Sequence, residues 1–424
     1  MIYTFLSLIP LGIAYLGTLP LYRTFWIELG VAFGFIGLGM LGLQFLFSGR
    51  FSWIAPTYGM DNIIQYHREV GIVAFLFVLA HPVTLILSDP QFLSYFDIQV
   101  NAPRAIALSF VSIALLGIMA TSLWRKVFKL NYELWRLFHG LLGVAIIFIG
   151  AIHSIQVSHY LDPAGKKVAL VGLMGFYLYL IIHTRLVRPW LNRKFPHKII
   201  KVQKERGDAF SLTIEPVGFR RMEFSAGQFA WITIHPSPFS LQQHPFSIVS
   251  TEKDKTMTFT AKIMGDFTSE WENLKPGAKV FVEGPYGSFV SAMDHPIFLI
   301  MGGIGITPGM SMLRTWRDSH DQRRTILLYA NLNWEEITFR DELEEMENEM
   351  NLKVIHLLEE PPEGWVGETG LIEEKILAKY LPHDKENFMY FICGPKPLMD
   401  ISEISLRNLG IEWKKIYTER FEIV

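Results

Sequence analysis

Four histidines lie in two apolar stretches with the same spacing in each. His67 and His81 are 14 residues apart, and so are His139 and His153. On an α-helix, at about 100° per residue, 14 steps fall roughly 40° short of four turns, so both imidazoles of a pair face nearly the same way. They lie about 21 Å apart along the axis, a separation that fits within a hydrocarbon layer about 30 Å thick.

Two such helices side by side would offer two facing couples of imidazoles. Each couple can grip a haem iron from both sides, and filled axial positions suit electron transfer better than ligand binding. A lone histidine in an apolar helix is more often a hydrogen-bonded core group than a ligand. Four in matched pairs favour ligation, because ionisable groups inside a membrane are costly and usually functional.

The composition agrees with a membrane protein that also has a soluble part. The chain has 424 residues, enough for two or three domains, and 50% of them are hydrophobic, concentrated in the first 190 positions. The formal net charge of −2 carries no nucleic-acid signal. The single cysteine, Cys393, excludes an intramolecular disulfide and a cysteine-held iron–sulfur cluster.

Six apolar stretches occur before residue 190, each near the ~20 residues needed to cross a bilayer. Pro10 and Pro20 interrupt or end the first. That stretch lacks a basic start and a clear cleavage site, so we expect a retained first helix rather than a signal peptide. The six predicted spans are residues 2–19, 25–48, 67–88, 104–123, 133–154 and 167–188.

Basic residues in the short loops set the expected orientation, because cytoplasmic loops carry an excess of Lys and Arg. The loop at 89–103 holds Asp89 and Asp97, whereas Lys166 and Lys167 weaken the contrast near the loop at 154–166. Six spans in this orientation leave both termini in the cytoplasm. The bases that define the cytoplasmic side follow spans two, four and six: Arg50, Arg125, Lys126, Lys129, Arg185, Arg188, Arg193 and Lys194.

This orientation also assigns the histidines to the two faces of the membrane. Spans three and five run in the same direction, so His67 and His139 form the inner couple. His81 and His153 form the outer couple. Arg68 and Arg136 lie near the inner couple, where they could pair with haem propionates or simply anchor the cytoplasmic side; we weigh the two equally.

After Pro189 the pattern changes to short alternating strands, which predict a small antiparallel β-barrel over roughly 196–290. From 296 onwards strands and helices alternate, as in a doubly wound α/β unit with a parallel sheet. Helices are expected near 308–318 and 335–349, with strands at 325–330, 352–358 and 388–393. The predicted domains are 1–190 (transmembrane), 196–290 (barrel) and 291–424 (α/β).

Two stretches of the barrel and one of the α/β unit carry candidate chemistry. Residues 244–250 read His-Pro-Phe-Ser-Ile-Val-Ser. Residues 262–268 read Lys-Ile-Met-Gly-Asp-Phe-Thr before a probable helix at 269–274, whose backbone N–H groups could hold a pyrophosphate. An ordinary capped helix, with Asp266 or Thr268 as N-cap, is the alternative.

A glycine-rich turn, residues 302–308, follows an apolar strand of the α/β unit. Its glycines allow close approach of a diphosphate to a helix N-terminus. Thr307 is a natural N-cap for that helix and Pro308 a natural first residue. The spacing differs from the Gly-x-Gly-x-x-Gly of dinucleotide dehydrogenases.

Together these stretches resemble the ferredoxin-reductase superfamily in its NADPH oxidase and ferric reductase branch, over nearly the whole chain. The His-Pro-Phe-Ser stretch matches the flavin motif of that branch, and the glycine turn matches its pyridine-nucleotide loop. The resemblance implies FAD, two b-type haems and NADH or NADPH. It assigns FAD to His244, Pro245, Phe246, Ser247, Lys262, Gly265, Asp266 and Thr268, and the nucleotide to Gly302, Gly303, Gly305, Thr307, Pro308, Gly394 and Pro395.

Two further residues take catalytic positions by the same resemblance. Cys393 would lie beside the nicotinamide C4. The alternative is that Cys393 is a small buried thiol with a structural role only. Phe421, in the terminal run Glu419-Arg420-Phe421, would stack on the flavin, although three residues follow it.

The function implied by the resemblance is that of a prokaryotic NADPH oxidase homologue in the bacterial inner (plasma) membrane. Electrons would pass from cytoplasmic NAD(P)H through FAD and two haems to O₂ on the outer side, forming superoxide. Two alternatives share every motif: a ferric-chelate reductase serving iron uptake, and an electron donor to a periplasmic protein.

The choice of nucleotide rests on the turn at 331–336, after the second strand of the α/β unit. A 2′-phosphate needs charge-assisted donors, but this turn holds no base and two acids. Asn331 and Asn333 can bind a ribose hydroxyl, Arg340 is expected to pair with neighbouring acids, and Lys396 is the one base that could reach a phosphate from the other side. We therefore expect NADH to be used at least as well as NADPH.

Overall fold

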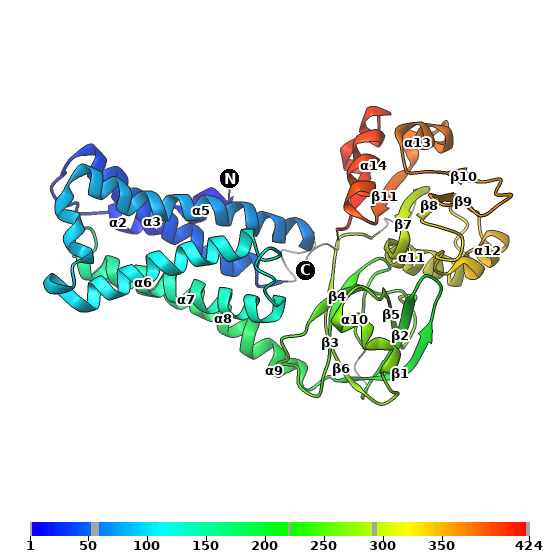
Figure 1. Cartoon of the computed structure of the whole chain (residues 1–424), viewed down its shortest axis with the longest axis horizontal. Helices are drawn as coiled ribbons and strands as arrows, with labels where there is room; N and C mark the ends of the chain where they lie inside the picture. The colour runs from blue at the N-terminus through cyan, green and yellow to red at the C-terminus, as the bar shows by residue number, and fades with distance from the viewer. Residues whose placement is uncertain (1, 52–58, 219–220, 291–294, 421–424) are drawn as a thin grey trace. The chain divides into compact units, whose positions relative to one another are not determined.

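The computed structural model describes residues 2–51, 59–218, 221–290 and 295–420. The chain forms two compact units, the first ending at Arg188 and the second beginning at Pro189. The first unit is a helical bundle, and the second combines an antiparallel barrel with a parallel α/β sheet (Figure 1). This is the fold class predicted from the sequence.

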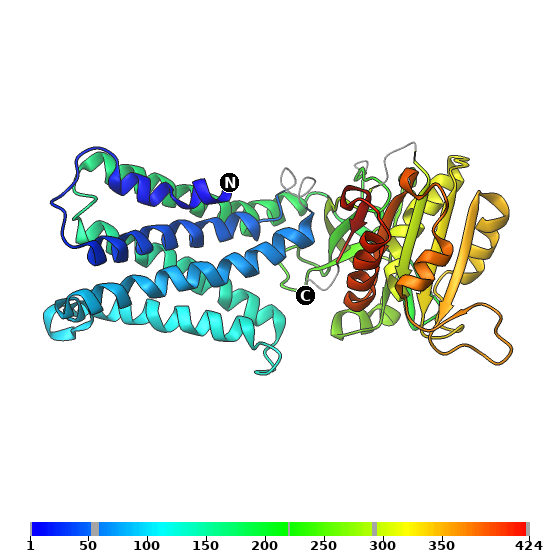
Figure 2. The same cartoon turned by 90° about the horizontal axis from the view of Figure 1, so that it is seen from above.

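The bundle contains five long apolar helices among the residues described. Each is near or above the ~20 residues needed to cross a bilayer, and Figure 2 shows α3 and α5 running side by side. The helices are α3 (Phe25–Phe47), α5 (Met60–Ser88), α6 (Ile98–Leu123), α7 (Tyr132–Val157) and α8 (Ala164–Ile182), and a π-helical turn (His183–Val187) continues α8 into α9 (Arg188–Asn192).

The first predicted span is not a single helix, so the predicted count of six spans is not confirmed. Residues 2–19 form two short helices, α1 (Ile2–Ser7) and α2 (Ile9–Tyr15). Pro10 lies in the first turn of α2, where its missing N–H is tolerated but cannot continue α1. Thirteen helical residues extend about 20 Å, less than the ~30 Å of a hydrocarbon core.

Small residues let α3 approach its neighbours closely, as is common between membrane helices. A Cβ at Gly39 would lie 2.2 Å from the carbonyl oxygen of Ser7, and one at Gly42 would lie 2.0 Å from the ring of Tyr177. The glycines of α3 therefore set how near α1 and α8 can pack against it.

The barrel is a six-stranded antiparallel sheet with the order β4-β3-β6-β1-β2-β5. Beyond β4, a bridge between Ile248 and Phe259 links the strand back to β5. The buried interior includes Leu212, Phe259 and Trp271. The strands are β1 (His197–Lys204), β2 (Ala209–Pro216), β3 (Phe229–Ile234), β4 (His244–Ser247), β5 (Met257–Lys262) and β6 (Lys279–Tyr286).

The α/β part is a parallel sheet with the order β10-β9-β8-β7-β11-β12. Its strands are β7 (Ile297–Gly302), β8 (Thr325–Asn331), β9 (Leu352–Leu358), β10 (Glu368–Thr369), β11 (Met389–Cys393) and β12 (Ile416–Thr418). Its helices are α11 (Ile306–Asp318), α12 (Arg340–Glu349), α13 (Glu374–Tyr380) and α14 (Lys396–Asn408).

The acidic helix expected from 335 begins five residues later, at Arg340. Phe339 before it has a left-handed backbone, with φ of 61°. Residues 332–339 form a turn instead, in which the side-chain oxygen of Asn333 accepts from the backbone N–H of Glu336 at 3.0 Å. Asparagine side chains stabilise turns in this way.

His197, the first residue of β1, makes the stability of the barrel depend on pH. It is 5% exposed, and neither ring nitrogen has a hydrogen-bond partner among the described residues. Burial lowers its pKa from 6.5 to about 4. In that window the unfolded chain binds a proton at His197 that the folded chain does not, so stability falls as the pH drops from about 6.5 towards 4.

We predict that His197→Gln flattens this dependence. The free energy of unfolding of the wild type, relative to the variant, should drop by roughly 3 kcal/mol at most across the window. Denaturant unfolding of the full chain in detergent, at a series of pH values and followed by tryptophan fluorescence, measures it. His383→Gln, at an exposed position, is the matched control. Parallel pH curves for wild type and His197→Gln would show that this histidine contributes nothing.

Candidate redox sites

The structure brings the four bundle histidines together as two facing couples. His67 and His81 lie on α5, and His139 and His153 lie on α7. The ring centres of His67 and His139 are 6.2 Å apart, and those of His81 and His153 are 6.5 Å apart. These are the two couples expected from the spacing, and their assignment to the inner and outer faces stays a prediction.

Both separations fit a metal held between two imidazoles. Metal–imidazole bonds are about 2.0–2.1 Å long and the ring centre lies roughly 1.2 Å beyond the nitrogen, so two rings on opposite sides of one ion have centres about 6.4 Å apart. Two imidazole rings with centres this far apart leave room for a metal ion between them. Haem ligation by these couples stays a prediction, and their geometry is compatible with it.

Hydrogen bonds at Nδ1 fix the ring orientation of two of these histidines. Nδ1 of His81 lies 2.8 Å from the carbonyl oxygen of Gly30. A carbonyl only accepts, so Nδ1 carries the proton and Nε2 keeps the free lone pair that a metal requires. Nδ1 of His139 lies 3.3 Å from the hydroxyl of Ser122. No sequence signal marked Gly30 or Ser122 as partners.

His81 also depends on a glycine opposite its ring. A Cβ at Gly34 of α3 would lie 2.8 Å from Nδ1 of His81. The ring therefore occupies the space that a side chain at position 34 would fill. Gly30 and Gly34 lie one helical turn apart, so both face α5.

Aromatic and basic side chains surround the couples. Trp135 lies 5.0 Å from His139, ring centre to ring centre. In the outer loop, Tyr95 packs edge-on at 6.0 Å from His153, and the guanidinium of Arg104 lies 4.1 Å from the centre of the Tyr95 ring. Of the two arginines weighed as propionate partners, Arg68 is exposed and Arg136 lies over the ring of Tyr132 at 5.5 Å.

We predict that Gly34→Ala lowers the occupancy of the outer couple while the inner couple keeps its haem. The added methyl collides with His81 and must displace its ring. Haem per chain from the pyridine haemochromogen spectrum, together with redox titration, measures this loss. Gly172→Ala on α8 is the matched control, because it lies at an exposed position and its Cβ would meet no atom within 4 Å. Equal haem content in both variants would contradict the role given to Gly34.

The predicted flavin strand lies at one edge of the barrel. His244, Pro245, Phe246 and Ser247 form β4 and pair antiparallel with β3. The His244 ring lies 4.3 Å from the ring of Phe267, ring centre to ring centre, and Phe246 lies 5.0 Å from Trp271. Phe267 thus joins the two predicted flavin motifs, although the sequence analysis gave it no role.

The predicted pyrophosphate loop begins at the end of β5. Gly265 precedes the four-residue helix α10 (Asp266–Ser269), so the helix expected at 269–274 starts earlier and is followed by a short 3₁₀ turn. The hydroxyl of Thr268 accepts from the N–H groups of Met264 and Gly265 at 3.0 and 3.3 Å. A Cβ at Gly265 would meet no atom within 4 Å, so the loop is open on that side.

Lys262, predicted to bind FAD, forms an ion pair with Glu336 at 2.6 Å. Glu336 belongs to the turn after β8, so this pair ties the barrel to the α/β sheet. The ammonium of Lys262 is about one-third exposed. Its role toward FAD stays a prediction, and the structure adds a role in holding the two folds together.

The glycine turn packs backbone against backbone on the end of β11. A Cβ at Gly305 would lie 2.6 Å from the carbonyl oxygen of Cys393, and one at Gly394 would lie 3.0 Å from the nitrogen of Gly302. Gly303 has φ of 51°, a left-handed conformation that suits glycine. The hydroxyl of Tyr329 donates to the carbonyl of Gly303 at 3.0 Å and so holds the turn.

The start of α11 differs from the capping predicted for it. The helix begins at Ile306, so Thr307 is its second residue and Pro308 its third. The hydroxyl of Thr307 donates to the carbonyl of Ile304 at 3.0 Å and does not accept from a backbone N–H. The helix starts two residues earlier because the preceding 3₁₀ turn, Gly303–Gly305, runs directly into it.

The remaining predicted residues lie around the ends of β11 and β12. Cys393 is fully buried at the end of β11, and Pro395 precedes α14. Arg420 pairs with Asp400 at 2.8 Å. Phe421 lies outside the described residues, so its proposed stacking on the flavin stays a prediction.

The end of β8 is rich in acids, and the bases that reach its turn are engaged: Lys262 pairs with Glu336 and Arg206 with Asp341. Arg340 lies over the ring of Trp334 at 4.3 Å and pairs with Asp341 at 3.7 Å. The backbone N–H groups of Glu359 and Glu360 donate to Asn331 and Leu332, at 3.1 and 2.7 Å, which brings two exposed acids beside the turn. Lys396 forms an ion pair with Asp400.

We predict that kcat/KM for NADH is at least as high as for NADPH, because a 2′-phosphate would meet acids here. Steady-state kinetics with both nucleotides decides this. Arg340→Ala should leave the ratio unchanged, since Arg340 is held by Trp334 and Asp341. A tenfold preference for NADPH, about 1.4 kcal/mol, would show that a base elsewhere reads the phosphate.

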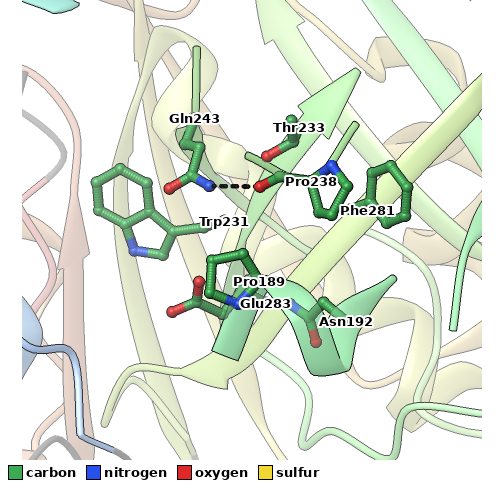
Figure 3. A pocket seen from close by; sticks show the side chains of 8 residues that line it. All are labelled: Pro189, Asn192, Trp231, Thr233, Pro238, Gln243, Phe281 and Glu283. Atoms are coloured by element: carbon green, nitrogen blue, oxygen red, sulfur yellow. Dashed lines mark hydrogen bonds between the residues drawn. The ribbon is translucent and has the colours of Figure 1, made fainter. Parts of the chain in front are cut away.

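A small hollow lies where α9 meets the barrel (Figure 3). Trp231 and Thr233 of β3 line it together with Phe281 and Glu283 of β6. Gln243 donates to the carbonyl of Pro238 at 3.5 Å across it. None of the predicted cofactor residues lines this hollow.

Three family models match the chain in order along its length. A ferric reductase like transmembrane component matches residues 33–150, an FAD-binding domain matches 194–290, and an oxidoreductase NAD-binding domain matches 299–403. The three matches cover the bundle, the barrel and the α/β sheet separately. The chain is therefore a membrane oxidoreductase with domains for FAD and NAD(P)H.

Curated NADH-cytochrome b5 reductases match about a third of the chain. NADH-cytochrome b5 reductase 1 of Debaryomyces hansenii is 31% identical over 156 residues, 36% of this chain and 55% of that protein. NADH-cytochrome b5 reductase 2 of Rattus norvegicus is 30% identical over 176 residues, 36% of this chain and 64% of that protein. The chain thus spans little more than half the length of these relatives.

Among solved structures, flavohemoglobin from Malassezia yamatoensis with bound FAD and heme covers 94% of this chain and 99% of its own, at 17% identity and a TM-score of 0.52. This is a likeness of fold alone. A ferric reductase-like membrane domain followed by an FAD-binding barrel and an NAD-binding α/β domain is the architecture of the NADPH oxidase and ferric reductase flavocytochromes, and the chain belongs to that family.

Proposed function

We propose that this chain is a transmembrane NAD(P)H oxidase, which passes electrons from cytoplasmic NAD(P)H to O₂ on the outer side and forms superoxide. The observation that carries the proposal is the pair of histidine couples, one above the other between α5 and α7, at separations that suit a metal between two rings. The soluble unit supplies the elements for a flavin and a nucleotide on the same chain.

When bound, NAD(P)H would supply a hydride, FAD would divide it into single electrons, and two haems would carry these across the bilayer. The residues of the chain bind and orient these groups. Nδ1 of His81 donates to the carbonyl of Gly30, which leaves Nε2 as the nitrogen available to a metal. His81 and His153 would together hold one haem, which would supply one-electron transfer.

On the cytoplasmic side, the packing of the glycine turn against Cys393 and Gly394 supports a shared nucleotide site. Gly302 and Gly305 have no space for a side chain there. The N-terminus of α11 faces the same turn and favours a diphosphate. The similarity to NADH-cytochrome b5 reductases supports NADH as one of the donors.

A ferric-chelate reductase is the second candidate, and the match to a ferric reductase like transmembrane component favours it. It would use the same donor, flavin and histidine couples. Only the acceptor differs, so the two functions are separated by measuring the acceptor.

We predict that purified protein in proteoliposomes, supplied with NADH, reduces O₂ faster than an Fe(III) chelate. Superoxide dismutase-sensitive reduction of a dye reports the first activity, and formation of an Fe(II) complex reports the second. Faster reduction of the chelate would select the reductase instead.

In the same assay, the variant His153→Ala tests whether electrons reach both acceptors through the couple that contains His153. It should lose one haem per chain and the activity toward both acceptors, while NADH still bleaches the flavin. The reason is that His153 belongs to the couple farther from the flavin in the predicted orientation. If NADH still reduced the flavin of this variant but no longer reduced its remaining haem, the inner and outer couples would be assigned the wrong way round.

A further inference from the structure

A groove of about 540 Å³ lies between α2 and the start of α3. Leu8, Leu11, Leu29 and Ala32 are among the residues that make its walls apolar, and Tyr15 and Glu28 lie at one end. Sites for small molecules are typically apolar hollows of about 300–1,000 Å³ with a few convergent polar groups. The groove exists because the first predicted span is broken into two short helices.

Glu28 lies in the first turn of α3, its side chain is 12% exposed, and its carboxylate pairs with Nε of Arg23 at 3.6 Å. It accepts from the hydroxyl of Tyr15 at 2.9 Å, from the hydroxyl of Tyr160, and from the backbone N–H of Arg23 at 3.2 Å. The rings of Tyr15 and Tyr160 are stacked with centres 5.1 Å apart. Ionisable groups in a membrane span are costly and usually functional.

The groove and the outer histidine couple lie on opposite faces of α3. Glu28, Leu29 and Ala32 face the groove. Gly30 and Gly34 face His81, since two residues along a helix turn the chain by about 200°. One helix diameter, about 10 Å, therefore separates the groove from the outer couple.

The groove needs a ligand with an apolar body and a small head that both accepts and donates hydrogen bonds. The Tyr15 hydroxyl can turn from Glu28 to a carbonyl oxygen, and the Glu28 carboxylate can accept from a hydroxyl. Quinones and quinols of the bilayer have this chemistry in their two redox states. A phospholipid tail would fill the walls but leave Tyr15 and Glu28 unused.

We propose that this groove binds a membrane quinone and that the quinone is a further electron acceptor of the chain. The reaction NADH + H⁺ + quinone → NAD⁺ + quinol balances two electrons and two protons: the C–H bond of the nicotinamide breaks, and two O–H bonds form on the quinone. The binding site stands on the groove alone. The reduction rests on the proposed function, which supplies the electrons.

Binding is tested on the full chain in nanodiscs made from quinone-free phospholipid, without NADH. The probe is a short-chain azidoquinone that cross-links when illuminated, and peptide mapping locates it. We expect labelling of α2 and the start of α3. Leu29→Trp should abolish it by filling the groove, and Tyr15→Phe should weaken quinone affinity about fivefold, the effect of one neutral hydrogen bond.

Leu116→Trp on α6, at a position 52% exposed, is the matched control and should label as the wild type does. Haem and FAD content per chain should be the same in all four proteins, which shows that each one folds. Labelling elsewhere, labelling unaffected by Leu29→Trp, or no saturable binding because phospholipid occupies the groove would overturn the proposal.

Reduction is tested separately, by anaerobic formation of quinol from NADH in the same nanodiscs. Leu29→Trp should lose at least nine-tenths of this activity, while NADH still reduces the flavin and haems at the wild-type rate. If NADH reduces neither flavin nor haem in the wild type, the proposed function fails but the binding result stands. If NADH reduces both and a bound quinone stays oxidised, the quinone is not an acceptor.

Discussion

The bundle depends on one constraint: polar imidazoles inside an apolar bundle must each find a partner. A buried polar group without one costs free energy. The equal spacing in α5 and α7 brings both rings of each helix to face the neighbouring helix at matched heights. A metal between the two rings of each couple, as proposed, would give the imidazoles their partner. The matched heights require α5 and α7 to run in the same direction, and α6 makes that possible by returning the chain between them.

The helices and loops around the two histidine couples also provide contacts to the imidazole rings. The glycine face of α3 gives His81 both its space and its hydrogen-bond acceptor. The loop before α6 folds back so that Tyr95 packs on His153 and Arg104 packs on Tyr95. The opposite face of α3 carries Glu28 and borders the groove. One helix thus lies between the couple of His81 and His153 and the groove.

In the soluble unit, the equivalent constraint is that the barrel and the α/β sheet must be held at a fixed distance from each other. Side chains of α11 reach across to the barrel: Ser311 donates to the carbonyl of Ser250 at 3.0 Å and Arg314 to that of Val249 at 3.1 Å. Lys262 and Glu336 add an ion pair. These contacts hold β4 and the glycine turn in one compact body, which hydride transfer between two bound groups requires.

Periodicity and short motifs in the sequence were sufficient for the fold class, the strand–helix alternation and the pairing of histidines. These depend on local spacing, as in the 14-residue interval between His67 and His81, which determines a helix face whatever surrounds it. The strands at 325–330 and 352–358 were found within one residue for the same reason. The flavin motif at 244–247 likewise coincides with one strand.

Tertiary structure decided what depends on contacts between distant residues. From composition alone, residues 2–19 were predicted to form one membrane span. In the structure Pro10 lies at the start of a second helix and Ser7 packs on Gly39, so this segment forms two short helices. Lys262 turned toward Glu336, Phe267 met His244, and Gly30 became the partner of His81, each across a separation that no local pattern encodes. Which residue a side chain contacts depends on how distant segments of the chain pack against each other, and only the folded structure contains that information.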